Sequence, residues 1–257
     1  MTDRPIGDWL VPDWPAPDSV LAVATTRTGG VSRGPYGSMN LGAHVGDDSA
    51  SVRENRRVLC ERLGLAAEPR WLSQVHGNTV VDADNLAAET AEADASVSRT
   101  SGTACAVLTA DCLPVLFAAR DGSAVAAAHA GWRGLAAGVL ERTVAAMQTP
   151  PAQLLAWLGP AISQAAFEVG LDVRDAFTAV DPAAAMHFEA NARGRWQADL
   201  YGLARQRLRA AGVRAIYGGG WCTLEDKGRF FSYRRDQACG RMASVVALRS
   251  SREPVTS

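Results

Sequence analysis

The sequence predicts an α+β fold in which helices lie on the outside of a mixed β-sheet. Apolar runs of strand length outnumber the helical patterns, and several of these runs are separated by turns short enough for hairpins. The chain has 257 residues and shows no internal repeat, low-complexity tract or linker. We therefore expect residues 1–257 to form one domain, with residues 1–18, rich in Pro, Asp and Trp, as an irregular N-terminal arm.

Strands are predicted where short apolar runs meet Gly, Pro or Asp. In the densest block, Asp121-Gly122 supplies the turn of a hairpin. The expected strands cover residues 21–26, 70–75, 79–81, 104–109, 114–119, 124–128, 154–158, 216–217 and 242–248.

Helices are predicted from apolar residues at helical spacing and from capping signals. Ser51-Val-Arg-Glu54 matches a capping box, so a helix is expected to begin there and to stop at Gly64. Further helices are expected over residues 134–148, 172–180 and 199–211. Residues 27–48 have the character of a long loop, residues 83–101 of a loop with a short helix, and residues 250–257 of a polar tail.

Composition excludes several classes of protein. A net charge of −1 provides no basic surface for nucleic acid, and the apolar stretches are too short to span a membrane. The acidic N-terminal segment does not resemble a secretory signal. Five cysteines without a CxxC pair fit reduced thiols, so we expect a cytoplasmic protein without a closed structural zinc site.

Three residues far apart in the sequence point to a metal. His76, Cys112 and His129 each stand where an apolar run meets Gly or Pro, and strand ends of this kind often carry the chemistry of α/β enzymes. Two imidazoles and a thiolate match a catalytic zinc site, which takes three protein ligands and leaves a fourth position open. Taken singly, His76 also fits a structural histidine, and Cys112 fits a small buried apolar residue.

Neighbouring residues suggest further roles but leave alternatives open. Asp111 lies between two apolar runs, where its carboxylate is either a cap at a strand end or a general acid/base. Arg133, at a Gly-rich helix entry after His129, and Arg27 are each either anion ligands or exposed turn residues.

Ten short motifs together resemble one family. They are Thr25-Thr-Arg-Thr-Gly-Gly-Val-Ser32, Asn40-Leu-Gly, His44-Val-Gly-Asp47, Gln74-Val-His-Gly77, Thr109-Ala-Asp-Cys-Leu-Pro114, His129-Ala-Gly-Trp-Arg-Gly134, Trp157-Leu-Gly-Pro-Ala161, Phe167-Glu-Val-Gly170, Phe230-Phe-Ser-Tyr-Arg-Arg-Asp236 and Gly240-Arg-Met-Ala-Ser244. The match, over residues 20–248, resembles the laccase-domain or YfiH-type family, also called polyphenol oxidase, purine nucleoside phosphorylase and peptidoglycan editing factor. The chain departs from the family pattern at Ser163, where Gly is usual, and at Trp221, where Arg is common.

The resemblance implies a four-layer α/β/β/α sandwich with mixed sheets and a zinc ion carried by His76, Cys112 and His129. Its motifs also imply a catalytic centre and a substrate site. The candidate catalytic residues are Asp111, Cys112 and His129, and the candidate substrate-binding residues are Arg27, Asn40, His44, Gln74 and Arg133. The polyphenol-oxidase name suggests copper, but only His44 and His187 would remain for a copper cluster, which disfavours it.

The function that the resemblance implies is zinc-dependent phosphorolysis of adenosine, inosine and methylthioadenosine, with some adenosine deamination. The expected partners are purine nucleosides and phosphate, with neither nucleic acid nor membrane. One rival is an amide hydrolase that edits a peptidoglycan precursor, with zinc or with Cys112 as nucleophile and His129 as base. Another rival is a structural protein that binds a nucleotide.

Overall fold

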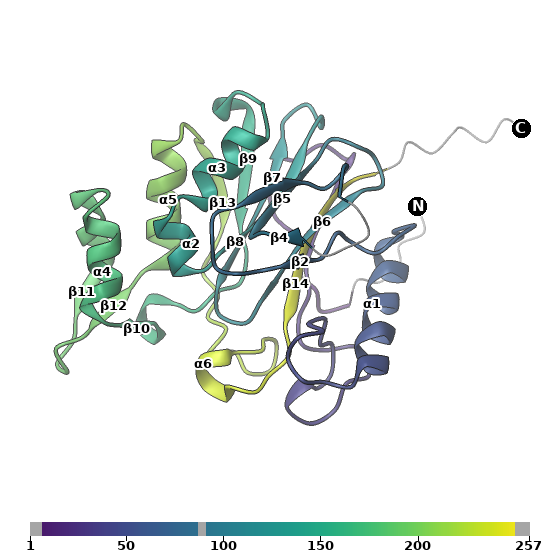
Figure 1. The fold of residues 1–257 in the computed structure, drawn as a ribbon, viewed down its shortest axis with the longest axis horizontal. Coiled ribbons are helices and arrows are strands. Elements are labelled where there is room, and N and C mark those ends of the chain that lie inside the picture. The colour runs from purple at the N-terminus through teal and green to yellow at the C-terminus, as the bar shows by residue number, and fades with distance from the viewer. Residues whose placement is uncertain (1–6, 87–90, 250–257) are drawn as a thin grey trace, which may run out of the picture.

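The molecule is a four-layer sandwich in which two β-sheets lie face to face between two layers of helices (Figure 1). This computed structural model describes residues 7–86 and 91–249. The four-layer α/β/β/α arrangement with mixed sheets, implied by the family resemblance, is confirmed. The layers agree with the pattern of the strands, because strands that are apolar on both faces must be covered on both faces of the sheet.

The larger sheet has six strands in the order β13-β9-β7-β8-β5-β3. Two pairs, β13 with β9 and β3 with β5, are parallel, and the other neighbours are antiparallel. The strands are β3 (Val80–Asp82), β5 (Ala95–Ser98), β7 (Leu113–Ala119), β8 (Val125–Ala130), β9 (Leu154–Leu158) and β13 (Ala215–Gly218).

The smaller sheet is antiparallel and consists of β1 (Val20–Ala24), β14 (Met242–Leu248) and β6 (Ala104–Thr109), in that order. Residues of both sheets, including Val107, Leu116 and Trp157, are buried together in one cluster of the core. Both faces of β7, β8, β6 and β14 are therefore apolar, and their runs lack the polar alternation of a half-exposed strand.

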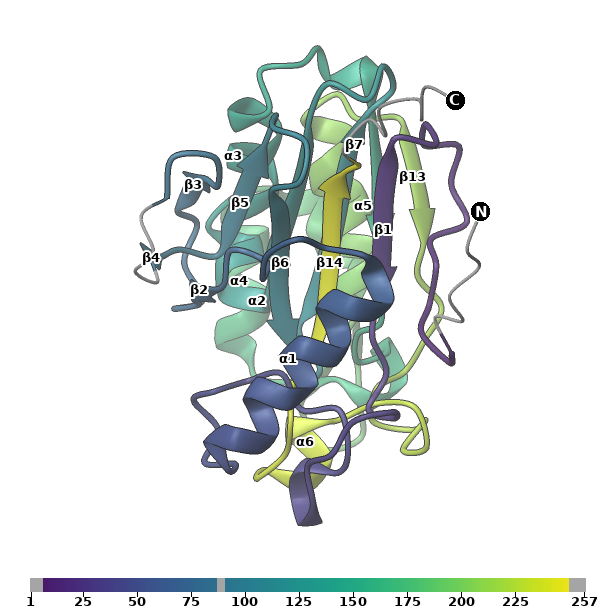
Figure 2. The ribbon, with the colours of Figure 1, turned by 90° about the vertical axis from the view of Figure 1, so that its right-hand side faces the viewer.

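Helix α1 (Ser49–Leu63) covers the outer face of the smaller sheet (Figure 2). It packs Leu59 and Leu63 into that face. The helix begins two residues before the predicted capping box, because the Asp48 side chain accepts the hydrogen bond from the backbone N–H of Ser51 and serves as the N-cap. The predicted stop at Gly64 is confirmed, and this residue is left-handed with φ 67°.

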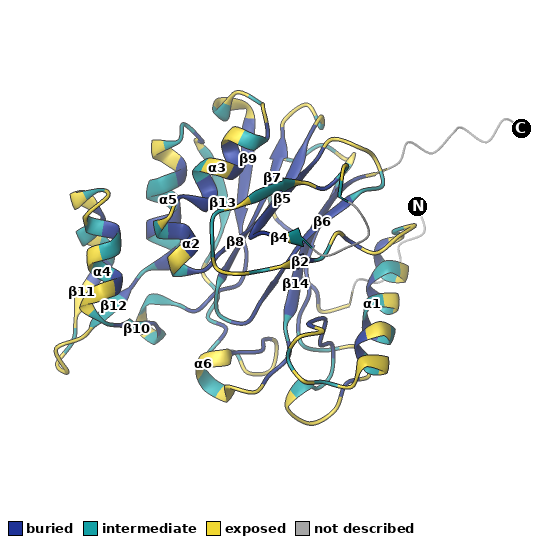
Figure 3. Cartoon of the chain, viewed as in Figure 1, coloured by how far each residue is buried: buried dark blue, intermediate teal, exposed yellow. Residues whose placement is uncertain are grey.

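The other helical layer contains α2 (Trp132–Ala136), α3 (Val139–Ala146) and α5 (Leu200–Ala210), which cover the larger sheet. In Figure 3 these helices are buried toward the sheet and exposed on the far side. The single helix predicted over residues 134–148 is wrong. It is divided at Gly138, whose φ of 90° lies outside the helical region.

Smaller elements flank the sandwich. In Figure 1, α4 (Leu171–Thr178) lies beside a sheet of β10 (Glu168–Val169), β12 (Trp196–Ala198) and β11 (Phe188–Ala190). The others are β2 (Leu72–Ser73), β4 (Ala91–Glu92), α6 (Tyr233–Asp236) and the 3₁₀ helices Gly34–Tyr36, Pro151–Gln153, Gln164–Ala166 and Pro182–His187. None of the helices among the described residues combines the length and the apolar character needed to cross a membrane.

Two irregular segments are more structured than predicted. The stretch 83–101, predicted to contain a short helix, instead supplies strands β4 and β5 in its described part, while residues 87–90 lie outside the described residues. In the arm, residues 1–6 also lie outside them, but Trp9 is 5% exposed in the core under α1 and Leu10 pairs with Ala24. The arm thus covers an edge of the smaller sheet.

Candidate metal centre

The three predicted ligands meet at one edge of the larger sheet. Cys112 directly precedes β7, and His129 lies near the end of β8. These strands pair with Leu113 opposite Ala130, so the start of one lies beside the end of the other. His76 reaches the same edge from the turn between β2 and β3. Antiparallel pairing therefore brings together residues that are distant in sequence.

The cluster has the composition and spacing of a metal site. One ligand atom from each of His76, Cys112 and His129 lies within 4.8 Å of the other two. The Cys112 sulfur is 3.9 Å from Nε2 of His76, and the two imidazole rings are 4.8 Å apart at an angle of 76°. Zinc bonds of about 2.0–2.3 Å in a tetrahedron separate neighbouring ligand atoms by about 3.5 Å, so small side-chain rotations close the site.

The cluster is open on one side. His129 is 3% exposed, Cys112 is partly exposed and His76 is exposed. A site of this kind leaves one coordination position accessible, as catalytic zinc sites do. Among the described residues, this is the one group of three or more His, Cys, Asp or Glu side chains close enough to share a metal.

Asp94, which the sequence analysis missed, supports two of the three ligands. Its fully buried carboxylate lies 2.8 Å from Nδ1 of His129. The same carboxylate accepts hydrogen bonds from the backbone N–H groups of Val75, His76 and Gly77, at 3.2, 3.0 and 2.6 Å. A histidine that donates Nδ1–H to a carboxylate presents Nε2 to a metal, so Asp94 fixes the ring of one ligand and the backbone of another.

The electrostatics of the metal-free cluster favour a thiolate. Burial raises the pKa of the Cys112 thiol, but interactions with His129 and His76 outweigh it and lower the pKa to about 6. Burial lowers the pKa of His129, whereas the Cys112 thiolate and the Asp94 carboxylate raise it to about 9. For Asp94, burial raises the pKa, but hydrogen bonds from His129 and the backbone leave it below its ordinary value.

Two glycines of the His129-Ala-Gly-Trp-Arg-Gly134 motif allow the segments to approach closely. A Cβ atom on Gly131 would lie 2.9 Å from Cδ2 of His76 and 3.1 Å from the Cys112 sulfur. A Cβ on Gly134 would lie 2.5 Å from the carbonyl oxygen of Gly77. The start of α2 therefore forms the back wall of the cluster, and a side chain at Gly131 would fill it.

Two residues of the centre have unusual backbone conformations. His76 has φ 60° and Asp111 has φ 96°, a region that non-glycine residues seldom adopt. Such outliers persist only where surrounding contacts hold them, and they concentrate at functional sites. At His76 the holding contacts are the hydrogen bonds of this backbone segment to Asp94.

Asp111, predicted as a catalytic residue, lies beside Cys112 with its carboxylate already bound. It accepts hydrogen bonds from the hydroxyls of Thr223 and Ser232, at 2.6 and 3.0 Å, and from the backbone N–H of Arg234 at 2.7 Å. These contacts attach the segment that ends in α6 to the residue before Cys112. A general-acid role for Asp111 stays a prediction.

Three of the predicted substrate-binding side chains make hydrogen bonds to the protein backbone. Arg27 donates to the carbonyl oxygens of Gly37 and Lys227 at 3.0 and 3.1 Å, with its guanidinium 4.7 Å from the ring centre of Phe231. Asn40 is fully buried and bonds to Gly42, Asp47 and Arg241. Gln74 exchanges two hydrogen bonds with the backbone of Leu108, at 2.7 and 2.8 Å, and so fastens the His76 segment to β6.

The other two predicted substrate-binding residues are exposed. Arg133 lies in α2, with its guanidinium 4.4 Å from the ring centre of Trp132. His44 lies in the loop before α1, and partial burial of its imidazole, followed by the charges of Arg241 and Arg56, lowers its pKa. In the sequence, Arg133 lies four residues after the ligand His129, and Gln74 lies two residues before the ligand His76.

The comparisons with known proteins agree with this combination of fold and site. An open cluster of two histidines and a cysteine, at the sheet edge of a four-layer sandwich, is the arrangement expected of a laccase-domain protein. The chain belongs to the family described as multi-copper polyphenol oxidoreductase laccase, whose model matches residues 21–249.

Relatives of known name and structure cover almost the whole chain. The purine nucleoside phosphorylase of Pseudomonas aeruginosa is 58% identical over 241 residues, which are 93% of this chain and 98% of the relative. The purine nucleoside phosphorylase YfiH of Escherichia coli is 54% identical over 239 residues, which are 93% and 98% of the two chains. A crystal structure of a Neisseria meningitidis protein, 54% identical, superimposes with a TM-score of 0.92 over 95% of this chain and all of that chain.

Proposed function

We propose that this protein is a zinc-dependent purine nucleoside phosphorylase. Adenosine, inosine and methylthioadenosine are its proposed substrates, and deamination of adenosine is a side activity. The observation that carries the proposal is the open His76, Cys112 and His129 cluster. The names of relatives that are 54–58% identical over almost their full length support the reaction class.

Zinc rather than copper is supported by the donor set. A thiolate and two imidazoles with one open position are typical of catalytic zinc. A multi-copper centre needs more imidazoles, and the remaining histidines, His44 and His187, lie outside the cluster. When bound, zinc would supply a positive charge that attracts phosphate or polarises water.

In phosphorolysis, a phosphate oxygen forms a bond to C1′ of the ribose while the bond from C1′ to the purine breaks, and the released base takes up a proton. The chain's own residues prepare this reaction. Asp94 holds Nδ1–H of His129, and the thiolate of Cys112 faces both imidazoles. Arg133 is an exposed cation two residues after Gly131, which borders the cluster, and is the proposed phosphate ligand.

The proposed cellular location is the cytoplasm. All five cysteines are free thiols in the structure, which fits a reducing compartment. The proposed partners are small molecules, namely purine nucleosides and phosphate, and the net charge of −1 supports neither nucleic-acid nor membrane binding.

A second candidate function is amide hydrolysis of a peptidoglycan precursor, with Cys112 as nucleophile and His129 as base. It is favoured by the low pKa of the thiol and the raised pKa of the imidazole in the metal-free cluster, the pattern of an activated cysteine. Zinc bound to the thiolate would remove this reactivity, so metal content distinguishes the two candidates.

Phosphate dependence tests the proposed reaction. Purified protein is incubated with adenosine, with and without phosphate, and the products are separated by chromatography. We expect adenine and ribose 1-phosphate in amounts that match the phosphate consumed. Release of adenine at the same rate without phosphate would make the reaction hydrolytic and contradict the proposal, and inosine with ammonia as the sole products would make the protein primarily a deaminase.

Substitution of the thiolate tests the metal. Cys112→Ala should lose both bound zinc, measured by elemental analysis, and turnover, by about 10²–10⁴-fold or more. Cys60→Ala, which removes a free thiol on α1, is the matched control and should retain both. Zinc retained in Cys112→Ala with turnover lost would favour the nucleophile role.

A further inference from the structure

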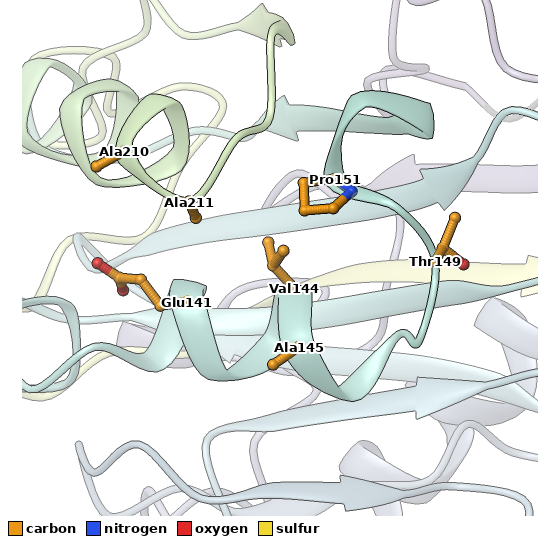
Figure 4. A pocket seen from close by; sticks show the side chains of 7 residues that line it. All are labelled: Glu141, Val144, Ala145, Thr149, Pro151, Ala210 and Ala211. Atoms are coloured by element: carbon orange, nitrogen blue, oxygen red, sulfur yellow. The ribbon is translucent and has the colours of Figure 1, made fainter.

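A pocket lies at the ends of β9 and β13, on the same sheet edge as the metal centre. Its volume is about 300 Å³, at the lower end of the range of about 300–1,000 Å³ for small-molecule sites. Its walls include Ser163, Tyr201, Trp221, Cys222, Glu225 and Arg229. A larger hollow of about 460 Å³ lies between α3 and α5 (Figure 4), but its lining is mostly Ala, Val and Pro, and its Pro151 stands before the start of β9, toward the opposite edge.

Asp111 connects the pocket at β9 and β13 to the metal centre. Its backbone carbonyl accepts a hydrogen bond from the N–H of Ile162 at 3.0 Å, and its carboxylate accepts one from the Thr223 hydroxyl at 2.6 Å. Ile162 precedes the pocket residue Ser163, and Thr223 follows the pocket residue Cys222. Since Asp111 is the residue before Cys112, the wall of the pocket is hydrogen-bonded to the residue beside a predicted metal ligand.

The charge of the pocket does not suit phosphate. Asp226 forms an ion pair with Arg229 at 2.6 Å, which balances those two charges. Glu225 is exposed, and its carboxylate has no hydrogen-bond or ion-pair partner among residues 7–86 and 91–249. One net negative charge repels an anion but accepts hydrogen bonds from hydroxyl or amino groups.

The aromatic wall suits a flat heterocycle. Trp221 is partly buried and packs on Trp157, with ring centres 5.6 Å apart at an angle of 59°. The Tyr201 hydroxyl is engaged by backbone groups, accepting from the N–H of Ala161 at 2.8 Å and lying 3.2 Å from the Gly159 carbonyl oxygen. Both rings are therefore held in place before a ligand binds, which lowers the entropic penalty of stacking.

We propose that this pocket binds the nucleoside part of the substrate, with the purine stacked on Trp221 and a hydrogen-bond donor of the nucleoside on Glu225. Phosphate is excluded by charge and binds on the other side of Asp111, at the metal centre. The inference rests on the proposed phosphorylase function and adds the place where the neutral substrate binds.

Two substitutions test the pocket. Trp221→Ala should weaken binding of adenosine, measured by calorimetry, by about 5- to 100-fold, the range for loss of an aromatic stacking partner, whereas Trp221→Phe should retain most of it. Glu225→Gln should weaken binding by about 3- to 10-fold, and Glu189→Gln, an exposed carboxylate on β11, is its matched control. The Michaelis constant for phosphate should change in none of them.

Substrate analogues identify the donor that Glu225 accepts. Purine riboside lacks the amino group of adenosine, 2′,3′-dideoxyadenosine lacks the 2′- and 3′-hydroxyls, and 5′-deoxyadenosine lacks the 5′-hydroxyl. Loss of the Glu225→Gln effect with one of these analogues assigns the donor that this analogue lacks. An effect that persists with all three analogues would overturn the role of Glu225.

The outcomes separate the pocket from the phosphorylase function. If the wild-type protein cleaves adenosine in a phosphate-dependent way, and both Trp221→Ala and Glu225→Gln bind adenosine as it does, the pocket proposal is wrong and the function stands. If the wild-type protein neither binds nor cleaves nucleosides, both are wrong. Because Trp221 packs on Trp157, Glu225→Gln is the deciding variant if Trp221→Ala does not fold, since the Glu225 carboxylate has no hydrogen bond or ion pair to lose among the described residues.

Discussion

The metal centre and the loop between β1 and α1 carry equally dense polar motifs, but their side chains have different partners. In the loop, Arg27 and Asn40 bond to backbone groups and hold an irregular segment together. At the metal centre, His76 and Cys112 face one another and His129, and the Asp94 carboxylate lies behind His129. A polar motif thus indicates chemistry where its donor atoms converge and structure where the backbone satisfies them.

One glycine of each region shows a difference of the same kind. At the centre, Gly131 stands where a side chain would enter the ligand cluster. In the loop, Gly34 has φ 58° and no atom within 4 Å of the place that a Cβ would take, so it is needed for backbone conformation alone, whereas a Cβ at Gly30 would clash with the carbonyl oxygen of Ser38. Substitutions can therefore test whether the two regions differ as the contacts indicate.

The largest effect is expected from Gly131→Ala. Its methyl group would lie 2.9 Å from the His76 ring and 3.1 Å from the Cys112 sulfur, so the ligands must move apart. We expect loss of stoichiometric zinc by elemental analysis, with turnover reduced by at least about 10²-fold. Gly228→Ala, where the nearest atom is 3.8 Å away, should retain both, and full zinc in Gly131→Ala would refute the close-packed geometry.

The metal-free protein provides the second test. The pKa of Cys112 is lowered from 9.0 to about 6, so its thiolate and its rate of alkylation should increase with pH around a midpoint near 6. The pKa of Cys60 is raised by burial and Glu68, so this thiol should react appreciably only above pH 9. Iodoacetamide labelling followed by peptide mass spectrometry measures both cysteines in one sample. Equal midpoints would remove the distinction between the two thiols.

Asp94→Asn should reduce zinc affinity by about 10–100-fold, the usual result of removing a carboxylate behind a metal-bound histidine. The amide keeps the shape but cannot offer two accepting oxygens to His129 and to the backbone of residues 75–77. Competition with a chelator measures the affinity, and the absorption spectrum of the cobalt-substituted protein reports ligand geometry. An unchanged cobalt spectrum and affinity would reduce Asp94 to a support of the fold.

The sequence predicts the ligands better than it predicts their support. The three ligands are uncommon residue types that bind metals, and they stand at the ends of apolar runs. This pattern can be recognised in the sequence alone for His76, Cys112 and His129. Asp94 lies in an acidic stretch next to β5, a strand of four small buried residues that pairs with β3 on one side and β8 on the other. Long-range pairing of that kind has no local pattern. Arg27 and Asn40 of the loop could not be distinguished from substrate-binding residues for the same reason. Their hydrogen bonds join them to backbone groups that are distant in sequence, and no local sequence pattern indicates such bonds.

Asp111 tests whether proximity to a ligand implies catalysis. Its three hydrogen bonds attach Thr223, Ser232 and Arg234 to the strand end before Cys112. We expect Asp111→Asn to lower the free energy of unfolding by about 1–3 kcal/mol, because one accepting carboxylate oxygen is replaced by an amide NH2 group that faces hydrogen-bond donors. Chemical denaturation measures this change. Normal stability with turnover reduced by about 10²–10⁴-fold would instead support the general-acid role predicted from sequence.

The smallest expected effect is on the Michaelis constant for phosphate, and it should differ between Arg133 and Arg27, which were both predicted from sequence to bind an anion. Arg133 is exposed in α2 next to the ligand segment, whereas Arg27 donates to two backbone carbonyl oxygens. Arg133→Ala should raise the Michaelis constant for phosphate by about 2- to 5-fold, since an exposed cation contributes up to about 1 kcal/mol, and leave that for nucleoside unchanged. Arg27→Ala should lower the melting temperature without a selective effect on phosphate, and Arg142→Ala, an exposed arginine on α3, should change neither. A selective phosphate effect in Arg27→Ala would place the loop in the anion site and erase the contrast between the two regions.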